Sequence, residues 1–375
     1  MQTAIACLFM RGGTSRGPYF LESELPADQA LRDRVLLAAM GSPDARQIDG
    51  LGGADPLTSK VAIVNRSSRP GIDIEFLFAQ VLINEARVDT TPNCGNMLAA
   101  VGPFALERGL AKAGGPETTL RILTRNTGML CDVTLQTPGG RIAYEGRARI
   151  DGVPGTSAPI KINFLETAGS VCGKLLPTRR VRDEFDGVPV TCIDNGMPVV
   201  VMRAGDLGRT GYESRDALNA DGELKARLES IRLKAGAAMG LGDVTKKVIP
   251  KMTLIAPPRA GGSVCTRTFI PHDCHAAVGV LGAVTVATAC VLDGSVAQGV
   301  AALPAGRSKL VSVEHPSGEF SVELELAAAD SQSVERAALL RTARLIMRGE
   351  VMIPAAVWDG KSSLGRAPDR TGTNS

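Results

Sequence analysis

Aromatic residues make up only 3% of the 375-residue chain, and histidine occurs three times. Proteins that bind single-stranded nucleic acid stack bases on aromatic side chains, so this composition argues against such a surface. The formal net charge of +3 is also too small to mark a nucleic-acid-binding protein. We therefore expect no nucleic-acid partner.

Paired cysteines are missing as well. The eight cysteines are scattered and form no C-x-x-C pair. The N-terminus reaches Arg11 after a short apolar run and has no charged leader segment, which is unlike a secretory signal peptide. Scattered thiols without a leader are typical of a reducing compartment. We therefore expect a cytoplasmic protein without a disulfide framework or a zinc site.

A stretch long enough to cross a membrane is also lacking. Residues 276–292 form an uncharged run of 17 residues, rich in glycine, alanine and threonine. A spanning helix needs roughly 20 predominantly apolar residues. The run is therefore expected to be a helix buried inside a domain, and no membrane partner is expected.

The stretch that carries the most chemistry surrounds Cys94. Pro92 and Asn93 end an extended segment, and the apolar residues that follow predict a helix ending near Gly109. Cys94 is then expected at the N-terminus of this helix. Unpaired N–H groups and the helix dipole favour an anion there, either a substrate carboxylate or a thiolate. The sequence therefore predicts a thiol that can donate or accept a proton.

The remaining elements are expected from hydrophobic periodicity and from turn residues. Strands are expected at 4–10, 18–21, 61–64, 72–83, 86–88, 120–124 and 131–136, and again at 188–193, 198–202, 253–256, 263–270, 310–314 and 320–326. Helices are expected at 25–41, 95–109, 214–241 and 276–292, and a second hairpin is expected to turn at 138–140.

The two halves of the chain repeat this order. Gly12 and Gly95 are 83 residues apart, and Gly196 and Ala277 are 81 apart. A helix made of alanine, glycine and valine on every side must be buried all round. The sequence therefore predicts an α+β fold of two pseudo-symmetric domains, each with antiparallel or mixed strands around a central apolar helix. Both helix N-termini are expected to face a ligand cleft between the domains.

The expected domains are residues 1–184 and 185–350. Residues 351–375 form a C-terminal segment that could pack back on the first domain. The polar end of this segment, from Gly360, is expected to be disordered.

Several strings resemble the PrpF-like isomerases, a family that shares the two-domain fold of diaminopimelate epimerase and proline racemase. The strings are residues 10–17, 50–64, 93–97, 151–155 and 271–276. The resemblance extends from the N-terminus to about residue 350. It implies an enzyme without metal or organic cofactor that moves a proton along an unsaturated di- or tricarboxylate, and it implies a homodimer.

Four further strings are most similar to the family members that act on 4-oxalomesaconate in bacterial gallate and protocatechuate breakdown. They are residues 41–50, 102–110, 192–200 and 315–320. This similarity implies keto–enol tautomerisation or a 1,3-allylic proton shift on that substrate. Two alternatives stay open, a 2-methylaconitate cis–trans isomerase and a catalytically silent carboxylate-binding protein.

The resemblance also implies that Lys60 and Cys94 are the acid/base pair. Lys60 can act as a base only if partial burial or nearby positive charge favours its neutral form. Otherwise it pairs with a substrate carboxylate. Cys94 is expected either to return the proton to the remote carbon or to lie beside a carboxylate.

Further substrate contacts are expected in the first domain. The glycine-rich loop after the first strand is suited to wrapping a carboxylate, and the start of the Cys94 helix adds backbone N–H donors. The residues are Arg11, Thr14, Ser15, Arg16, Asn96 and Met97. Ser59 is grouped with them, although it can also serve only to position the backbone.

In the second domain, Arg267, His272 and His275 are expected to hold another carboxylate. The two histidines do not make a zinc site, because no third ligand lies at a suitable spacing. The epimerases carry a second catalytic cysteine at the start of this domain's helix, where His275 is expected here, one residue after Cys274. A symmetric two-thiol mechanism is therefore not expected, and a proton shift on one face is favoured.

Overall fold

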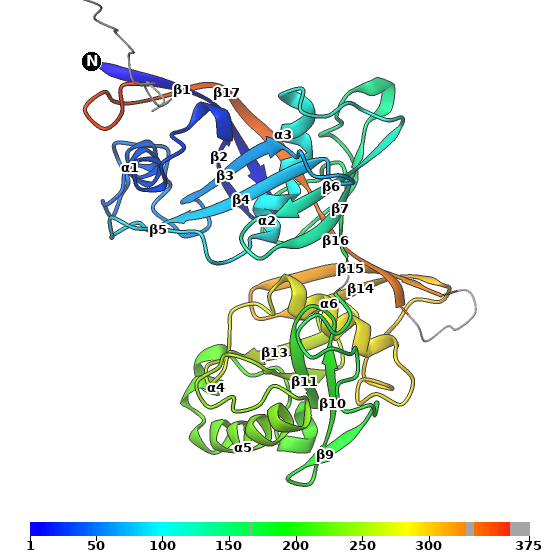
Figure 1. The fold of residues 1–375 in the computed structure, drawn as a ribbon. Coiled ribbons are helices and arrows are strands. Elements are labelled where there is room, and N and C mark those ends of the chain that lie inside the picture. The colour runs from blue at the N-terminus through cyan, green and yellow to red at the C-terminus, as the bar shows by residue number, and fades with distance from the viewer. Residues whose placement is uncertain (166, 328–333, 361–375) are drawn as a thin grey trace, which may run out of the picture. The chain divides into compact units, whose positions relative to one another are not determined.

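The computed structural model describes residues 1–165, 167–327 and 334–360 (Figure 1). The chain divides into two compact units. Unit 1 consists of Met1–Ala148, Thr156–Ile160 and the chain from Arg341 onward. Unit 2 consists of Arg149–Gly155 and Lys161–Leu340. The tail predicted to be disordered lies outside the described residues beyond Gly360.

Unit 1 is built mainly from strands. They are β1 (Gln2–Gly12), β2 (Ser15–Leu21), β3 (Lys60–Arg66), β4 (Ile74–Val81), β5 (Val88–Asp89), β6 (Glu117–Thr124), β7 (Met129–Gln136) and β17 (Ala343–Pro354). Its helices are α1 (Gln29–Met40), α2 (Gly95–Ala99) and α3 (Val101–Glu107), with the 3-10 turns η1 (Glu22–Glu24) and η2 (Pro138–Gly140).

Unit 2 is also built mainly from strands. Its strands are β8 (Ile160–Phe164), β9 (Asp183–Phe185), β10 (Val188–Asp194), β11 (Pro198–Arg203), β12 (Lys251–Ala256), β13 (Val264–Phe269), β14 (Ser308–His315), β15 (Gly318–Leu326) and β16 (Val334–Arg341). Its helices are α4 (Arg215–Ala220), α5 (Gly222–Ala238) and α6 (Val280–Val291), with the 3-10 turn η3 (Ala204–Leu207).

The two units pair their strands in the same order. In unit 1, β1–β2 is antiparallel, β2–β3 parallel, β3–β4 antiparallel, β4–β6 parallel and β6–β7 antiparallel. In unit 2, β10–β11, β11–β12, β12–β13, β13–β14 and β14–β15 repeat this alternation. The helices also fall at matching points, because α2–α3 precedes β6 as α6 precedes β14. The α+β class and the internal repeat expected from the sequence are confirmed.

In unit 1, side chains of β3 point alternately to two helical layers. Val61 and Ile63 join the apolar cluster under α1. Because side chains alternate along a strand, Lys60, Ala62 and Val64 point to the opposite face. That face carries α2 and α3, which both contact β3. The period of two therefore places Lys60 on the side of the sheet where the Cys94 helix packs.

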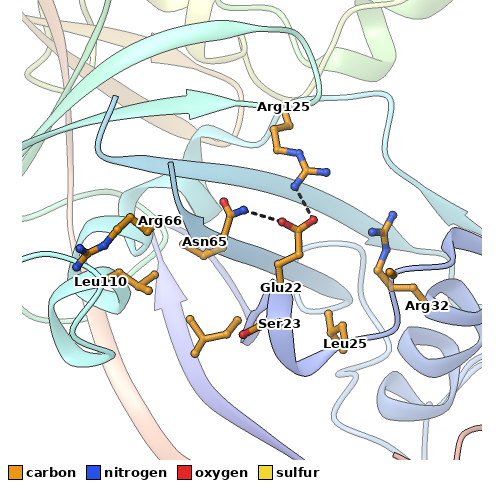
Figure 2. A pocket seen from close by; sticks show the side chains of 11 residues that line it. Glu22, Ser23, Leu25, Arg32, Asn65, Arg66, Leu110 and Arg125 are labelled. Carbon is orange, nitrogen blue, oxygen red and sulfur yellow. Dashed lines mark hydrogen bonds and ion pairs between the residues drawn. The ribbon is translucent and has the colours of Figure 1, made fainter. Parts of the chain in front are cut away.

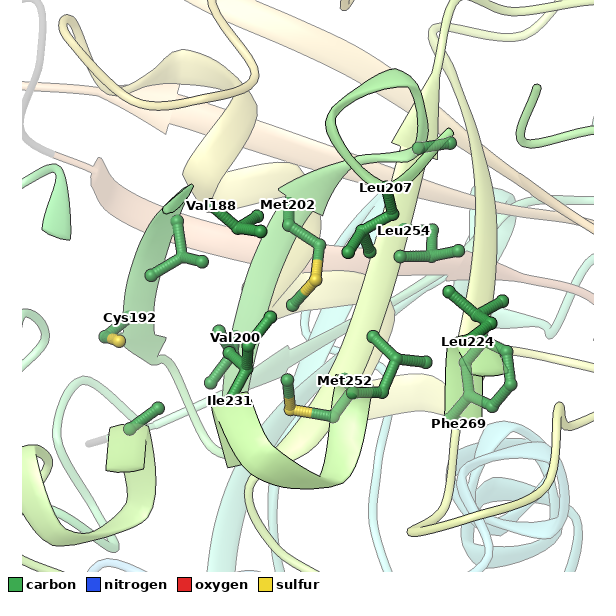
Figure 3. Close-up of a cluster of buried hydrophobic side chains, with 14 of the residues drawn as sticks. Val188, Cys192, Val200, Met202, Leu207, Leu224, Ile231, Met252, Leu254 and Phe269 are labelled. Atoms are coloured by element: carbon green, nitrogen blue, oxygen red, sulfur yellow. The ribbon is translucent and has the colours of Figure 1, made fainter. Parts of the chain in front are cut away.

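In unit 2, β12 alternates in the same way. Met252 and Leu254 belong to the apolar cluster that includes the buried residues of α4 and α5, and Phe269 of β13 packs with them (Figure 3). Lys251 and Thr253 therefore point to the opposite face of the sheet. On that side lies α6, which contacts β10, β11, β14 and β15. Ten of its twelve residues are buried, as expected for a helix that is apolar on every side.

Four local predictions differ from the structure. The helix expected at 214–241 is divided at Asp221 into α4 and α5. The helix expected at 95–109 is broken at Ala100, because Pro103 cannot donate a backbone hydrogen bond to the turn before it. The helix expected from 276 begins at Val280, because Gly279 has a φ of 77° and the carbonyl of Ala276 accepts hydrogen bonds from Ser317. After η2 the chain forms no hairpin strand before β8, apart from an isolated bridge between Ala148 and Ser157.

The unit boundaries also differ from the expected domain limits. The chain enters unit 2 near residue 161 rather than 185, because β8 pairs with β16 of that unit. It returns to unit 1 at Arg341 rather than at 351, because the whole of β17 pairs with β1.

Two absences hold within the described ranges. There, no helix combines the length and hydropathy that a membrane crossing needs. In the same part of the chain, no three His, Cys, Asp or Glu side chains gather as metal ligands would.

Candidate active site

Lys60 is the first residue of β3 and is only 8% exposed. Its Nζ donates a hydrogen bond of 2.6 Å to Oε1 of Gln80, the residue opposite it on β4. The same nitrogen lies 4.8 Å from the centre of the Phe78 ring, two residues along β4 on the same face. A carbonyl oxygen and an aromatic face both attract an ammonium group. The position of the amine is therefore fixed from two sides.

The orientation of Gln80 is fixed in turn by the backbone. Its Nε2 donates to the carbonyl of Ser59 at 2.8 Å and to that of Pro56 at 3.1 Å. With the amide nitrogen committed to two acceptors, Oε1 must face Lys60. Gln80 thus connects the amine to the glycine-rich loop that precedes β3.

Gln47 stabilises that loop through buried hydrogen bonds. It is 1% exposed, and its Nε2 donates to Ser59 Oγ at 2.7 Å while its Oε1 accepts from the N–H of Ala54 at 3.0 Å. A Cβ at Gly52 would lie 2.2 Å from the end of the Gln47 side chain, so a larger residue there would displace the Gln47 amide. Ser59 Oγ also donates to the carbonyl of Val81 at 2.7 Å. The hydroxyl of Ser59 is thereby used inside the protein, which supports a positioning role.

Cys94 is the N-cap residue of α2 and is partly exposed. The helix start is held by Tyr19, whose buried hydroxyl donates to the carbonyl of Met97 at 2.6 Å. Burial raises the pKa of Tyr19 well above its usual value, and negative charge at Cys94 raises it further. Tyr19 therefore stays protonated as a donor and couples electrostatically to the thiol.

The other described cysteines are protected from ionisation. Burial raises the pKa of Cys7 and Cys274 to about 11 and that of Cys172 and Cys290 to about 12. Burial likewise raises the pKa of the three remaining thiols, Cys131, Cys192 and Cys265.

The β1–β2 loop packs directly on the start of α2. A Cβ at Gly12 would lie 2.3 Å from the carbonyl oxygen of Asn96, and one at Gly13 would lie 2.2 Å from Oδ1 of the same residue. Nδ2 of Asn96 donates to Thr14 Oγ1 at 2.9 Å, and its Oδ1 accepts from Nε of Arg341 at 3.2 Å. The structure therefore brings the predicted residues Thr14 and Asn96 together beside Cys94.

The other predicted loop residues lie differently. The guanidinium of Arg11 donates to the carbonyl of Gly13 at 2.8 Å and to both oxygens of Thr342, so it braces the loop. Burial, followed by the charge of Arg344, lowers the pKa of Arg11. Ser15 is 1% exposed and its Oγ has no partner among the described residues. Arg16 is exposed.

The residues predicted in unit 2 have different partners. Arg267 shares its strand face with Phe269, the side of the sheet that carries α4 and α5, and its Nε donates to the carbonyl of Glu213 at 2.8 Å. His272 is half-exposed and its Nδ1 lies 3.5 Å from Glu229 of α5. His275 is exposed, with Nδ1 within 3.0 Å of the Ala277 backbone. Since α6 begins at Val280, His275 does not cap it; the N-cap is Gly279.

The chain matches the family described as PrpF protein over residues 2–354. It belongs to the PrpF family. The (4E)-oxalomesaconate Delta-isomerase of Novosphingobium sp. (strain KA1) is 60% identical, over 92% of this chain and 97% of its own length. The 4-oxalomesaconate tautomerase of Pseudomonas putida is 57% identical, over 96% and 99%. The crystal structure of a methylitaconate-delta-isomerase is similar with a TM-score of 0.84 and 36% identity, covering 98% of this chain and 99% of the other.

A large hollow in unit 1 of this PrpF-family chain holds neither Lys60 nor Cys94 (Figure 2). It has a volume of about 660 Å³ and lies around Glu22. Glu22 there accepts from Arg125 at 2.5 Å and from Asn65 at 2.7 Å. The central carboxylate is thus already satisfied, and the hollow offers no free acid or base of its own.

Sequence patterns alone did not reveal the residues that position Lys60 and the start of the Cys94 helix. These residues are Tyr19, Gln47, Phe78 and Gln80. The signal for two of them was present, since Phe78 and Gln80 share the face of β4 that Lys60 occupies on β3. Using it required the register between the strands, which the sequence does not state.

Proposed function

We propose that this protein is an isomerase that moves a proton on 4-oxalomesaconate. The similarity that supports this most is to the Delta-isomerase and the tautomerase named above, at 60% and 57% identity over nearly the whole chain. The geometry agrees with the proposal, because Lys60 and Cys94 lie on elements that pack together, β3 and α2. The silent-binding alternative is disfavoured, since an amine held from two sides and a partly exposed thiol are both intact.

In the proposed reaction the amine acts as the base and the thiol acts as the acid. We assign to Lys60 the removal of a proton from the methylene between the ketone and the double bond of the substrate. The electron pair left behind spreads over the ketone oxygen and the remote carbon as a dienolate. Cys94 gives its proton to the remote carbon, and proton exchange with solvent restores both groups. Nothing is oxidised or reduced, so the reaction needs no further reactant.

The two relatives that support the proposal carry names that imply different products. A tautomerase yields the enol, with the proton on oxygen, whereas a Delta-isomerase moves the double bond, with the proton on carbon. The methylitaconate enzyme of similar structure is also named a delta-isomerase. The allylic shift, in which the proton moves from carbon to carbon, is therefore the form of the reaction that we propose.

The test is to add enzymatically prepared 4-oxalomesaconate and follow its absorbance and its proton NMR spectrum in D₂O. Wild type should place one deuterium on the remote carbon. Lys60→Met and Cys94→Ser should each lower kcat by roughly 100-fold or more, because general acid–base groups contribute about 10²–10⁴-fold. Lys112→Met, a change at an exposed lysine of the same unit, should leave kcat unchanged.

Three results would contradict the proposal. Formation of the enol without deuterium on the remote carbon would exclude the allylic shift. Turnover of 2-methylaconitate without turnover of 4-oxalomesaconate would favour the alternative substrate. Full activity in Lys60→Met would remove the amine from the mechanism.

The homodimer and the cytoplasmic location expected from the sequence accompany this proposal as predictions. Light scattering of the purified protein and fractionation of the source cells would test them.

A further inference from the structure

The last strand of unit 1, β17, has one open edge. It is twelve residues long and pairs with β1, and no other strand pairs with it among the residues that the structure describes (Figure 1). Natural proteins usually keep edge strands short or cover them, because an open row of N–H and C=O groups attracts another strand. A long open edge therefore indicates a partner strand.

The side chains of β17 also suit a partner. Ile346 is 48% exposed, Met347 is 40% exposed and Met352 is 47% exposed. Two opposite charges, Arg348 and Glu350, lie between them. Single exposed apolar residues are common on protein surfaces, but several on one edge strand mark an interaction site.

The backbone shows which residues of β17 can bond to a partner. Just after the strand, the N–H of Ala355 donates to the carbonyl of Met1, so these two residues form a hydrogen-bonded pair. Hydrogen-bonded and non-hydrogen-bonded pairs alternate along an antiparallel ladder. The register with β1 is continuous over this part of β17, so Arg348, Glu350 and Met352 direct their N–H and C=O groups away from β1.

Gly349 lies in the middle of this edge. A Cβ there would meet no described atom within 4 Å outside its neighbours in sequence, and its φ is not in the left-handed region. The fold of the single chain therefore gives no reason for glycine at this position. Glycine inside a strand often marks the close approach of another backbone. A non-hydrogen-bonded pair brings its two Cα atoms to about 4.5 Å, which suits Gly349 at the centre of a strand pair.

We propose that β17 pairs with β17 of a second copy of this chain, antiparallel about a twofold axis at Gly349. This register sets Arg348 of each copy opposite Glu350 of the other. It also sets Ile346 opposite Met352. The twofold axis makes each of these pairs occur twice, and both kinds of pair stabilise antiparallel strands.

The charges of β17 are available for this pairing. Nη2 of Arg348 donates to Glu107 of its own chain at 2.6 Å, but a guanidinium has five N–H donors and can bind a second carboxylate. Glu350 is exposed and forms no hydrogen bond or ion pair with any residue that the structure describes. The second copy would therefore give Glu350 a cation while Arg348 keeps Glu107.

Neighbouring registers are less favourable. An axis at Arg348 or at Glu350 would set two like charges directly opposite each other, which destabilises a strand pair. An axis at Met347 would set Glu350 opposite Arg344. The irregularity of the ladder at Ile346 turns the backbone groups of Arg344 toward β1, so they cannot bond to the second copy.

The first test is a cross-link at the axis. Gly349→Cys should form a covalent dimer with diamide as oxidant, because a non-hydrogen-bonded pair has a Cα separation that a disulfide can span. Met352→Cys is the matched control on the same strand. Its two copies would be six residues apart along the paired strands, about 20 Å, so it should not cross-link. Non-reducing electrophoresis compares both with wild type, and failure of Gly349→Cys to cross-link, or equal cross-linking of both variants, would overturn the proposal.

The second test changes the charges and follows the oligomeric state by sedimentation velocity. Wild type should be a dimer at micromolar concentration. Glu350→Arg sets arginines opposite each other and should raise the dimer dissociation constant roughly 100-fold or more. Arg348→Glu sets glutamates opposite each other and should have the same effect. An equal mixture of the two variants should restore the dimer, because every arginine then faces a glutamate.

Glu184→Arg, the same change at an exposed glutamate of unit 2, should stay dimeric. A monomeric wild type would overturn the proposal. A Glu350→Arg dimer as tight as that of wild type would also overturn it, because the homodimer would then use another surface. If Arg348→Glu fails to fold without its contact to Glu107, the cross-link and Glu350→Arg still decide the question. Dimer formation does not involve the substrate, so an enzyme inactive on 4-oxalomesaconate would refute the proposed function and leave these tests intact.

Discussion

The contact between Gln80 and Lys60 provides the sharpest test of how the site is held. Gln80→Leu removes the acceptor of the Lys60 amine and two donors to backbone carbonyls. A neutral hydrogen bond contributes about 0.5–1.5 kcal/mol net and one to a charged group about 1.5–3 kcal/mol. Because the Pro56 carbonyl is exposed and can bind water instead, we expect the free energy of unfolding to fall by about 2–4 kcal/mol.

This loss is smaller than the stability of most domains, about 5–15 kcal/mol, so the variant should fold. Its amine, however, would be free to leave its position over Phe78. A misplacement of about 1 Å can cost on the order of 10²-fold in rate, so kcat should fall roughly 10- to 100-fold.

Urea unfolding and steady-state kinetics on 4-oxalomesaconate measure the two effects. Gln136→Leu is the matched control, because its amide donates only to the exposed Glu117 at 2.6 Å. That change should cost less than about 1 kcal/mol and leave kcat unaltered. If Gln80→Leu were as stable and as active as Gln136→Leu, the fixed amine would not be part of the mechanism.

Three further predictions concern the support of the site, the thiol and the second unit. Tyr19→Phe removes the buried hydrogen bond to Met97, so urea unfolding should show a loss of about 1–2 kcal/mol in the free energy of unfolding. The kcat of this variant should fall by a larger factor than its KM rises. A variant with the stability and kcat of wild type would contradict this prediction. Iodoacetamide at pH 8 should label Cys94 at least roughly 10-fold faster than any other described cysteine, as peptide mass spectrometry would show, and tricarballylate, a saturated tricarboxylate, should slow that labelling. Hydrogen bonds from the buried Arg232 lower the pKa of Glu229 in the folded protein. The pair therefore stabilises the fold at any pH above the usual glutamate pKa. This stabilisation is lost as the pH falls through the lowered pKa of Glu229 in the folded state. Glu229→Gln should therefore be roughly 1–3 kcal/mol less stable than wild type at pH 7, with the difference closing below about pH 4; a constant difference from pH 7 to pH 3 would refute the linkage.

Local patterns were sufficient for much of the fold. Alternating apolar residues and turn glycines located most strands. The similar separation of a turn glycine from a glycine-rich helix in each half, 83 and 81 residues, indicated the repeat. The family resemblance drawn from short strings is confirmed by the match over residues 2–354. The catalytic roles of Lys60 and Cys94 stay predictions. The structure places Lys60 on the face of the unit 1 sheet that carries α2, the helix that begins after Cys94.

The errors arose where contacts distant in sequence decide the structure. β17 was not expected, since its pairing with β1 joins Gln2 to Pro354 and leaves no local signal. The start of α6 was placed too early, because the hydrogen bonds that hold Ala276 outside the helix come from Ser317.

The antiparallel pairing of β1 with β17 has a consequence for biosynthesis. β1 leaves the ribosome long before its neighbour β17, and Val351 and Ile353 of β17 complete the apolar cluster around Ile5. At about 5–20 residues per second, the nascent chain must wait on the order of 10–40 s between emergence of the rest of unit 1 and arrival of its last strand. During that interval the backbone groups on one edge of β1 lack their hydrogen-bond partners. A chain truncated before residue 343 would keep this edge exposed, so chaperones would have to hold it or proteases remove it.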